Sequence, residues 1–216
     1  MQSGGPVMWP LLACSIAVLT VIIERSLFWI SLEREHNRKL MDAVLALAEN
    51  GQWELIRQKT TNSQDHIIRL LVVGIVHRDY DMGRAMEAEA DLTVQRMSRF
   101  MPVLDTMITV APLLGIFGTV LGIIGSFKVL GASGIADPKL VTSGIAQALI
   151  TTATGLAIAI IAVIPYNYFN TRITRAIHIM EKYATNLEVV HRKTAVKNGK
   201  QSALTMPRNR QYNNTL

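Results

Sequence analysis

Three stretches of this 216-residue sequence contain no Asp, Glu, Lys or Arg. They run from Met1 to Ile23, from Thr106 to Phe127 and from Leu140 to Thr171. A helix needs about 20 mostly apolar residues to cross the hydrocarbon core of a bilayer, and each stretch is long enough. The sequence therefore predicts an all-α membrane protein with three transmembrane helices.

The charged residues indicate how the chain is oriented. No Lys or Arg precedes the first span, whereas Arg25, Arg34, Arg38 and Lys39 follow it closely. Because Lys and Arg collect on the cytoplasmic side of a membrane, we expect a periplasmic amino terminus and a cytoplasmic carboxyl terminus. Residues 172–216 hold nine Lys and Arg against two Asp and Glu. This orientation explains that surplus without nucleic acid as a partner.

Helical periodicity and turn residues divide the rest of the chain. Leu40, Val44 and Leu47 recur at helical spacing before Asn50-Gly51, a typical helix end, and Asp81 is placed to cap the helix that leads to the second span. Ile173, Ile177, Met180, Ala184, Leu187 and His191 approach a heptad seam, which predicts a helix that packs against copies or neighbours. We expect a first transmembrane helix over 1–32, a cytoplasmic helical bundle over 33–104, a second transmembrane helix over 105–130, a short periplasmic loop over 131–139, a third transmembrane helix over 140–171, a cytoplasmic helical extension over 172–193 and a basic disordered tail over 194–216.

The sequence lacks the patterns of the common enzyme classes. It has no Gly-rich phosphate loop and no nucleophile elbow, so we expect no enzymatic activity and no cofactor. Its single cysteine, Cys14, lies in the first span. The spacing of His36, His66 and His77 does not resemble a metal site, so we expect these histidines to have surface or packing roles.

The second span carries a stripe of glycines. Gly115, Gly118, Gly122 and Gly125 are three or four residues apart and share one narrow arc of a helix. Glycine is a poor helix former, and a glycine stripe in a membrane helix allows another backbone to approach closely. Thr119 lies beside the stripe, either as part of ordinary helix packing or as a hydroxyl that borders a polar or partner-filled interior.

The third span carries a polar stripe. Ser143, Gln147, Thr151 and Thr154 fall within an arc of about 80° at 100° per residue, and Thr152 lies to one side. A threonine hydroxyl is easily satisfied by its own helix, whereas the Gln147 amide has two donors and an acceptor that need external partners. Polar groups at membrane depth face protein or water, so the stripe predicts a polar interior.

These segments together resemble the MotA/TolQ/ExbB proton-channel family, and most closely its ExbB/TolQ branch. The resemblance lies in GGPVMWPLL (residues 4–12) with Glu24-Arg25, in LDTMITVAPLLGIFGTVLGII (residues 104–124) and in GIAQALITTATGLAIAIIAVIPYNYF (residues 144–169). It implies a pentamer in the bacterial inner membrane whose second and third helices line a pore. It also implies an ExbD/TolR-like single-span partner with a proton-carrying membrane aspartate, and a TonB-like periplasm-spanning client.

The resemblance also assigns residues. Thr119 in GTV and Thr152 in TTATGL match the hydroxyls that face the partner's aspartate, and Gln147 stands where ExbB and TolQ usually have a glutamate. We predict three sets of site residues. The pore-facing residues of the ion pathway are Thr119, Gln147, Thr152, Thr151 and Ser143. The residues of helix packing or partner contact are Pro112, Gly115, Gly118, Gly122, Gly125, Gly155 and Pro165, and the possible inner-mouth charges are Glu24, Arg25 and Asp105.

The two inner spans have no Asp, Glu, Lys or Arg between Thr106 and Phe127 or between Leu140 and Thr171. Glutamine does not bind and release a proton at accessible pH, so if the protein conducts H⁺, a partner must supply the titrating group. Three possibilities stay open: conduction through the partner's aspartate alone, a different ion such as Na⁺, or a weakly conducting paralogue. Glu24 and Arg25 also fit a simple membrane-boundary pair, and Asp105 also fits a charge favoured by the helix dipole.

Two functional hypotheses from different classes remain open. The first is an ExbB-like subunit of a proton-driven molecular motor that energises TonB-dependent outer-membrane transport, with a TolQ-like role in envelope constriction and cell division as its variant. The second is a non-conducting scaffold that uses the same oligomer to organise envelope proteins. The first predicts dependence on a partner and on the proton gradient, and the second predicts that Thr119 and Thr152 are dispensable.

Overall fold

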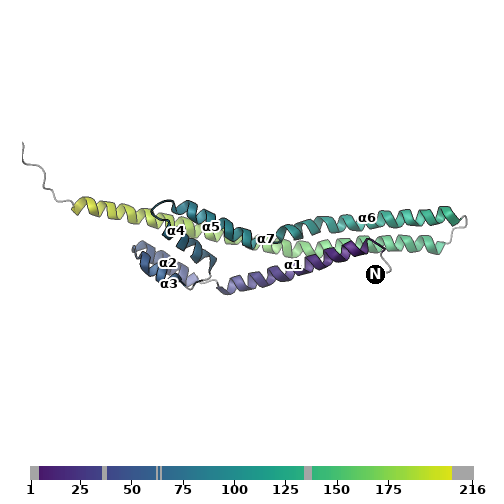
Figure 1. Cartoon of the computed structure of the whole chain (residues 1–216), viewed down its shortest axis with the longest axis horizontal. Coiled ribbons are helices and arrows are strands. Elements are labelled where there is room, and N and C mark those ends of the chain that lie inside the picture. The colour runs from purple at the N-terminus through teal and green to yellow at the C-terminus, as the bar shows by residue number, and fades with distance from the viewer. Residues whose placement is uncertain (1–4, 36–37, 62, 64, 134–137, 206–216) are drawn as a thin grey trace, which may run out of the picture. The chain divides into compact units, whose positions relative to one another are not determined.

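The protein is described from a computed structural model that covers residues 5–35, 38–61, 63, 65–133 and 138–205. All regular elements within these residues are α-helices (Figure 1). Segments of α1, α6 and α7 are long and apolar enough to cross a membrane, which confirms the three predicted spans. The helices are α1 (Met8–Glu35), α2 (Arg38–Glu49), α3 (Trp53–Thr60), α4 (His66–Val76), α5 (Met82–Met97), α6 (Met101–Ser133) and α7 (Pro138–Thr205).

The chain forms two compact units. The membrane unit comprises Met1–Ser31 and Gln95–Thr174, and the bundle unit comprises Leu32–Val94 and Arg175–Leu216. The long helix α7 therefore contributes its first part to the membrane unit and its second part to the bundle unit.

In the membrane unit, α1 runs alongside α6 and the first part of α7 (Figure 1). A stripe of α1 residues three or four positions apart is buried, whereas Ile16, Leu19, Ile23 and Leu27 on its other side are exposed. Such an exposed apolar face suits contact with lipid, so α1 is held by packing on one side only. The buried stripe consists of Leu11, Cys14, Val18, Val21, Arg25 and Trp29.

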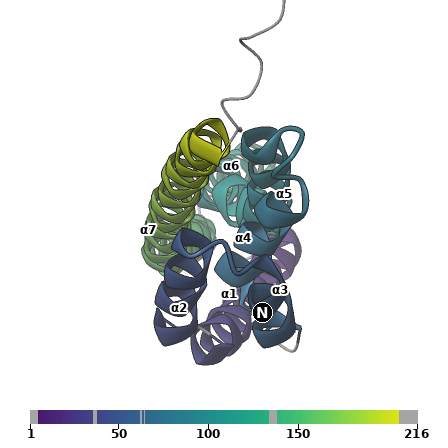
Figure 2. The same ribbon diagram turned by 90° about the vertical axis from the view of Figure 1, so that its left-hand side faces the viewer.

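The bundle unit has its own apolar core, which α2, α3, α4, α5 and the second part of α7 enclose (Figure 2). Asp65 caps α4 by accepting a hydrogen bond from the Ile67 amide at 2.8 Å. Asp81 accepts from the Arg84 amide at 3.1 Å, which confirms the predicted cap of α5. Gly51 has φ +68°, a conformation that glycine adopts easily, at the predicted end of α2. The buried core residues are Met41, Val44, Ala48, Ile56, Ile67, Ile68, Leu70, Leu71, Ile75, Met82, Met86, Met180, Leu187 and Val190.

The sequence predicts that the α7 seam packs against copies or neighbours. Within one chain it packs against neighbours, because Met180 and Leu187 join the core of the bundle unit. The helix also continues through residues 194–205, where we had expected a disordered tail. This stretch mixes good helix formers, such as Ala, Lys and Gln, with poorer ones, such as Asn198 and Gly199, so its composition did not predict a helix. The predicted cap Asp137 lies outside the described residues.

Candidate functional site

The candidate site is built on a close contact between α6 and α7. A Cβ atom added at Gly115 would lie 3.0 Å from the Thr152 Cα atom, and one at Gly118 would lie 2.7 Å from the Thr151 Oγ1 atom. A Cβ atom at Gly155 would overlap the backbone oxygen of Ala111. Membrane helices associate largely through such van der Waals contact between small residues. The expected packing role of Gly115, Gly118 and Gly155 agrees with this geometry.

The rest of the glycine stripe divides into two kinds of position. A Cβ atom at Gly122 would lie 2.8 Å from the Ala148 Cβ atom, so this position also packs against α7. A Cβ atom at Gly125 would meet nothing within 4 Å. The two helices still meet beyond Gly125, because a Cβ atom at Gly144 of α7 would overlap the Ser126 Oγ atom. Within one chain Gly125 is therefore the one member of the stripe without a packing contact on α7. The predicted contact residues Pro112 and Pro165 both lie inside their helices.

The hydroxyls of Thr119 and Thr152 meet between these two helices. They form a hydrogen bond with each other. The Thr119 hydroxyl also lies 3.2 Å from the carbonyl oxygen of Gly115 and 3.3 Å from that of Ala148, and the Thr152 hydroxyl lies 3.0 Å from the same Gly115 oxygen. Each hydroxyl has one hydrogen, so the pair donates only two of these bonds at a time. Both side chains are partly buried in a single chain. The two hydroxyls, which the resemblance assigns to one ion pathway, thus form one polar point in an otherwise apolar contact.

This pair has a definite chemical capacity. A hydroxyl carries one donor and two acceptor lone pairs, and its hydrogen rotates to suit the neighbouring group. It donates to a carboxylate and accepts from a carboxylic acid. The Thr119 and Thr152 pair can therefore bind a carboxyl group in both protonation states without changing its own charge.

Thr151 differs from its neighbour Thr152. Its side chain is buried against Gly118, and its hydroxyl donates to the carbonyl oxygen of Ala148 at 2.7 Å. A residue that lines a pore between subunits would be exposed in a single chain, so the structure corrects our pore-facing assignment of Thr151. This hydroxyl is satisfied within its own helix and serves the packing of α6 on α7.

Gln147 and Ser143 lie at a second polar location in the membrane unit. With Gly5, Ser126 and seven further residues they line a cavity of about 490 Å³ between the amino end of α1, α6 and α7. A Cβ atom at Gly5 would lie 2.5 Å from the Gln147 Nε2 atom, and Gly5 has φ +68°. The sequence did not predict this contact, because nothing in the helical pattern places the start of α1 beside the third span.

The predicted inner-mouth charges occupy very different environments. Arg25 is 2% exposed, and its Nη1 atom donates to the carbonyl oxygens of Arg96 at 3.0 Å and Met97 at 3.2 Å. These carbonyls end α5, where a helix leaves its last acceptors without partners. The guanidinium group also pairs with Glu24 and lies 5.7 Å from the ring centre of Phe100, which has φ +65°.

Arg25 therefore holds the junction between α5 and α6, a structural role that neither of our two interpretations included. Asp105, by contrast, is exposed on α6. The structure does not bring Asp105 together with the Thr119 and Thr152 pair, because Thr119 lies more than three helical turns further along α6. The sequence signal that could have indicated this role is an arginine next to an acidic residue where the first uncharged stretch ends.

The fold and the site together define a three-span helical membrane protein with a hydroxyl pair between two uncharged spans. Residues 59–182 match the MotA/TolQ/ExbB proton channel family. The chain belongs to this family, which confirms the resemblance to its ExbB/TolQ branch. Members are inner-membrane transport and channel proteins and form no known class of enzyme.

Three relatives illustrate the match. The chain is 31% identical over 199 residues to ExbB-like protein 3 of Synechocystis sp., a match that covers 89% of this chain and 93% of the relative. It is 34% identical over 201 residues to ExbB-like protein 1 of the same organism, with 88% and 76% covered. It is 38% identical over 113 residues to the Tol-Pal system protein TolQ of Pseudomonas aeruginosa, with 52% and 49% covered.

Proposed function

We propose that this protein is the ExbB-like subunit of a proton-driven motor in the bacterial inner membrane. Its copies form a pentamer, and α6 and α7 line the central pore. An ExbD/TolR-like single-span partner occupies that pore and carries the ion on a membrane aspartate. The assembly works on a TonB-like client and so energises transport across the outer membrane.

The hydroxyl pair of Thr119 and Thr152 carries this proposal. Both hydroxyls lie at membrane depth, where a polar group is unfavourable unless protein or water satisfies it. Their two hydrogens are shared between the bond that joins them and the Gly115 oxygen. Their lone pairs can accept from a carboxylic acid, and rotation of one hydroxyl turns its hydrogen towards a carboxylate. A carboxyl group that alternates between its acid and its carboxylate fits that requirement, and the chain's own inner spans contain none.

Gln147 has a secondary place in this mechanism. Its neutral amide hydrogen-bonds without changing charge. Among the described residues that line the cavity shared by Gln147, Ser143 and Gly5, none has a titrating side chain. In our proposal these polar groups serve the ion's passage towards the partner's aspartate, and the partner alone binds and releases the proton. H⁺ is the transported ion, and Na⁺ is the alternative.

The orientation is part of the proposal. The amino terminus is periplasmic, and the bundle unit and the end of α7 are cytoplasmic. This follows because no Lys or Arg precedes the first span, several follow it closely, and residues 172–216 hold nine Lys and Arg against two Asp and Glu. A cysteine at exposed position Asp42 should react with an impermeant maleimide only after the cells are opened. Reaction in intact cells would reverse this topology.

A TolQ-like role is the second candidate. The 38% identity to TolQ of Pseudomonas aeruginosa over 113 residues favours it, because this relative is named for the Tol-Pal system. Cells without the gene distinguish the two roles. Loss of iron-siderophore uptake supports the TonB-linked role, and chained cells with a leaky outer membrane support the TolQ-like role.

The test of the hydroxyl pair is the double substitution Thr119→Val and Thr152→Val. Valine keeps the shape of threonine and removes the hydroxyl, so assembly should persist while partner-dependent proton flux into vesicles is lost. Thr154→Val is the matched control, because the Thr154 hydroxyl donates to the carbonyl of its own helix at Ile150. Normal flux with intact assembly in the double variant would favour the scaffold hypothesis.

A further inference from the structure

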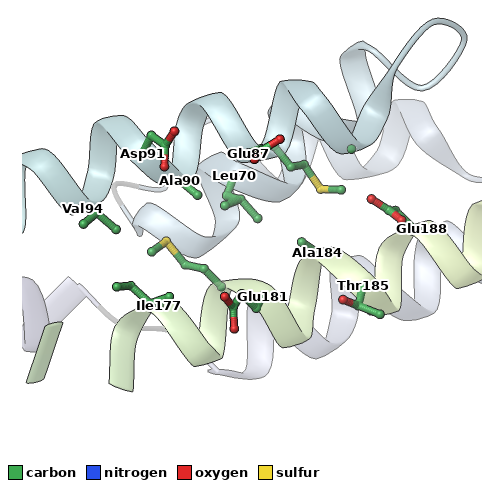
Figure 3. A pocket seen from close by; sticks show the side chains of 13 residues that line it. Leu70, Glu87, Ala90, Asp91, Val94, Ile177, Glu181, Ala184, Thr185 and Glu188 are labelled. Carbon is green, nitrogen blue, oxygen red and sulfur yellow. The ribbon is translucent and has the colours of Figure 1, made fainter. Parts of the chain in front are cut away.

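The bundle unit contains a groove that the proposed mechanism does not use. It lies between α5 and α7, with a volume of about 440 Å³ (Figure 3). Its floor is apolar, and the carboxylates of Glu87 and Asp91 on α5 and of Glu181 and Glu188 on α7 flank it. Among the described lining residues none is Lys or Arg. The apolar floor is formed by Leu70, Met86, Ala90, Val94, Ile177, Met180 and Ala184.

A complementary surface lies on the same α7 helix. Arg175, Lys182 and Lys193 are exposed and share one face, because they are seven and eleven residues apart. At 100° per residue this face points about 140° away from the groove-lining residues of α7. Val189, which is 44% exposed, lies on the same face. We call the three basic residues, together with the exposed Val189 between them, the basic stripe.

The long basic side chains suit this groove chemically. Lys and Arg lay their methylene stems on apolar surface and keep their charged ends in polar surroundings. Stems on the apolar floor would therefore bring the charged ends of Lys182 and its neighbours to the flanking carboxylates. A groove without flanking carboxylates would not favour Lys and Arg over uncharged side chains.

The positions along α7 also match. The stripe spans about 27 Å from Arg175 to Lys193, and the groove residues from Ile177 to Glu188 span about 16 Å within that length. Two copies related by rotation about an axis parallel to α7 keep the same height. The stripe of one copy then lies level with the groove of the next, with no sliding along the axis.

We propose that the α5–α7 groove binds the basic stripe of a second copy of this chain. Every copy carries both surfaces, on different faces, so the contact is heterologous and closes into a ring when the rotation fits. The proposal rests on the homo-oligomer of the proposed function and identifies its electrostatic contact. Charge complementarity of this kind fixes orientation and disfavours wrong partners.

The first test is disulfide cross-linking of the full chain in native membranes. In a Cys14→Ser background, Ala184→Cys places a thiol in the groove and Val189→Cys places one on the stripe. A chain with both cysteines should give a ladder of oligomers on oxidation, whereas each single-cysteine chain should give background dimer only. Dimers clearly above that background from either single-cysteine chain would mean a contact between like faces and would overturn the proposal.

Charge reversal provides the matched control. The groove variant Glu87→Lys with Asp91→Lys, and the stripe variant Arg175→Glu with Lys182→Glu, should each lower the ladder by about tenfold or more. Combining both pairs should restore it to within about twofold. A restored ladder also demonstrates that the substituted chains fold, and a failure to restore it would contradict the pairing.

Native mass spectrometry of the same membranes separates the two proposals. If the oligomer is intact but the double-cysteine chain gives no cross-linked ladder, the groove contact is overturned and the motor proposal stands. A chain that is monomeric under mild extraction would overturn both. A different protein retained on the groove of every copy would likewise exclude a second copy as the occupant.

Discussion

The close contact at Gly155 provides a quantitative test of how α6 and α7 associate. Alanine at this position adds a Cβ atom that overlaps the Ala111 oxygen and lies 3.1 Å from the Gly115 Cα atom. Both neighbours are backbone atoms, so neither yields by a change of rotamer. The two helices must separate instead. Overpacking of this kind costs about 1–3 kcal/mol.

The substitution also has a favourable effect, because alanine is a better helix former than glycine by about 1 kcal/mol. Gly125→Ala isolates that effect, since a Cβ atom at Gly125 meets nothing within 4 Å. The propensity gain cancels between the two variants. The free energy of unfolding should therefore be lower for Gly155→Ala than for Gly125→Ala by about 1–3 kcal/mol, a factor of about 5–150 in the unfolding equilibrium.

The assay is reversible unfolding of the detergent-solubilised chain by added SDS, followed by the loss of helical ellipticity. Gly155→Ala should unfold at a lower SDS fraction than Gly125→Ala, with a similar slope. An equal or higher midpoint for Gly155→Ala would refute the reasoning, because it would mean that α6 and α7 have room for a methyl group at their closest approach.

Three further predictions address other parts of the chain. Gln147→Glu should leave assembly intact and change the size or the pH dependence of the partner-dependent flux. Flux equal to that of the parent across a pH series would remove residue 147 from the ion route. Arg25→Met should lower the free energy of unfolding by about 2 kcal/mol or more, because the Arg96 and Met97 carbonyls lose their donor, whereas Arg99→Met at an exposed site should change it little in the same SDS titration. Asp65→Ala should destabilise the bundle unit by about 1 kcal/mol through loss of the α4 cap, and hydrogen exchange at Ile67 should rise relative to an Asp79→Ala control.

The three spans and the helix ends were predictable because their causes are local. A charge-free stretch, an Asn-Gly pair or an Asp before an apolar face acts within a few residues, so α2, α5 and the membrane helices follow from the printed sequence. The extension of α7 beyond residue 194 was not predicted, since a polar stretch that mixes good and poor helix formers does not by itself indicate a helix.

The site was predictable in part. The helical arc correctly grouped the glycines that contact α7, but it also included Gly125, because periodicity gives the direction of a side chain and not whether a neighbouring helix lies within contact there. It grouped Thr151 with the pore-facing residues, although Thr151 is buried against Gly118. The meeting of Thr119 and Thr152 came from the family resemblance, since their helical positions alone do not pair them.

Contacts between distant segments were the least predictable. Arg25 and the end of α5 are more than 70 residues apart, and Gly5 and Gln147 are still further apart in the sequence. Each contact depends on how complete helices pack, so no local pattern reports it. Arg25 shows the consequence: a charge that we assigned to a membrane boundary or an ion route is a buried hydrogen-bond donor.

The position of Arg25 has a consequence for how the protein is made. Its carbonyl partners are 71 and 72 residues further along the chain. At about 5–20 residues per second, a ribosome needs about 4–14 s to synthesise that distance. During this interval the only partners of the Arg25 side chain are those of its own helix, Glu24 and the ring of Phe28. The first helix thus reaches its final environment only after the end of α5 has been synthesised.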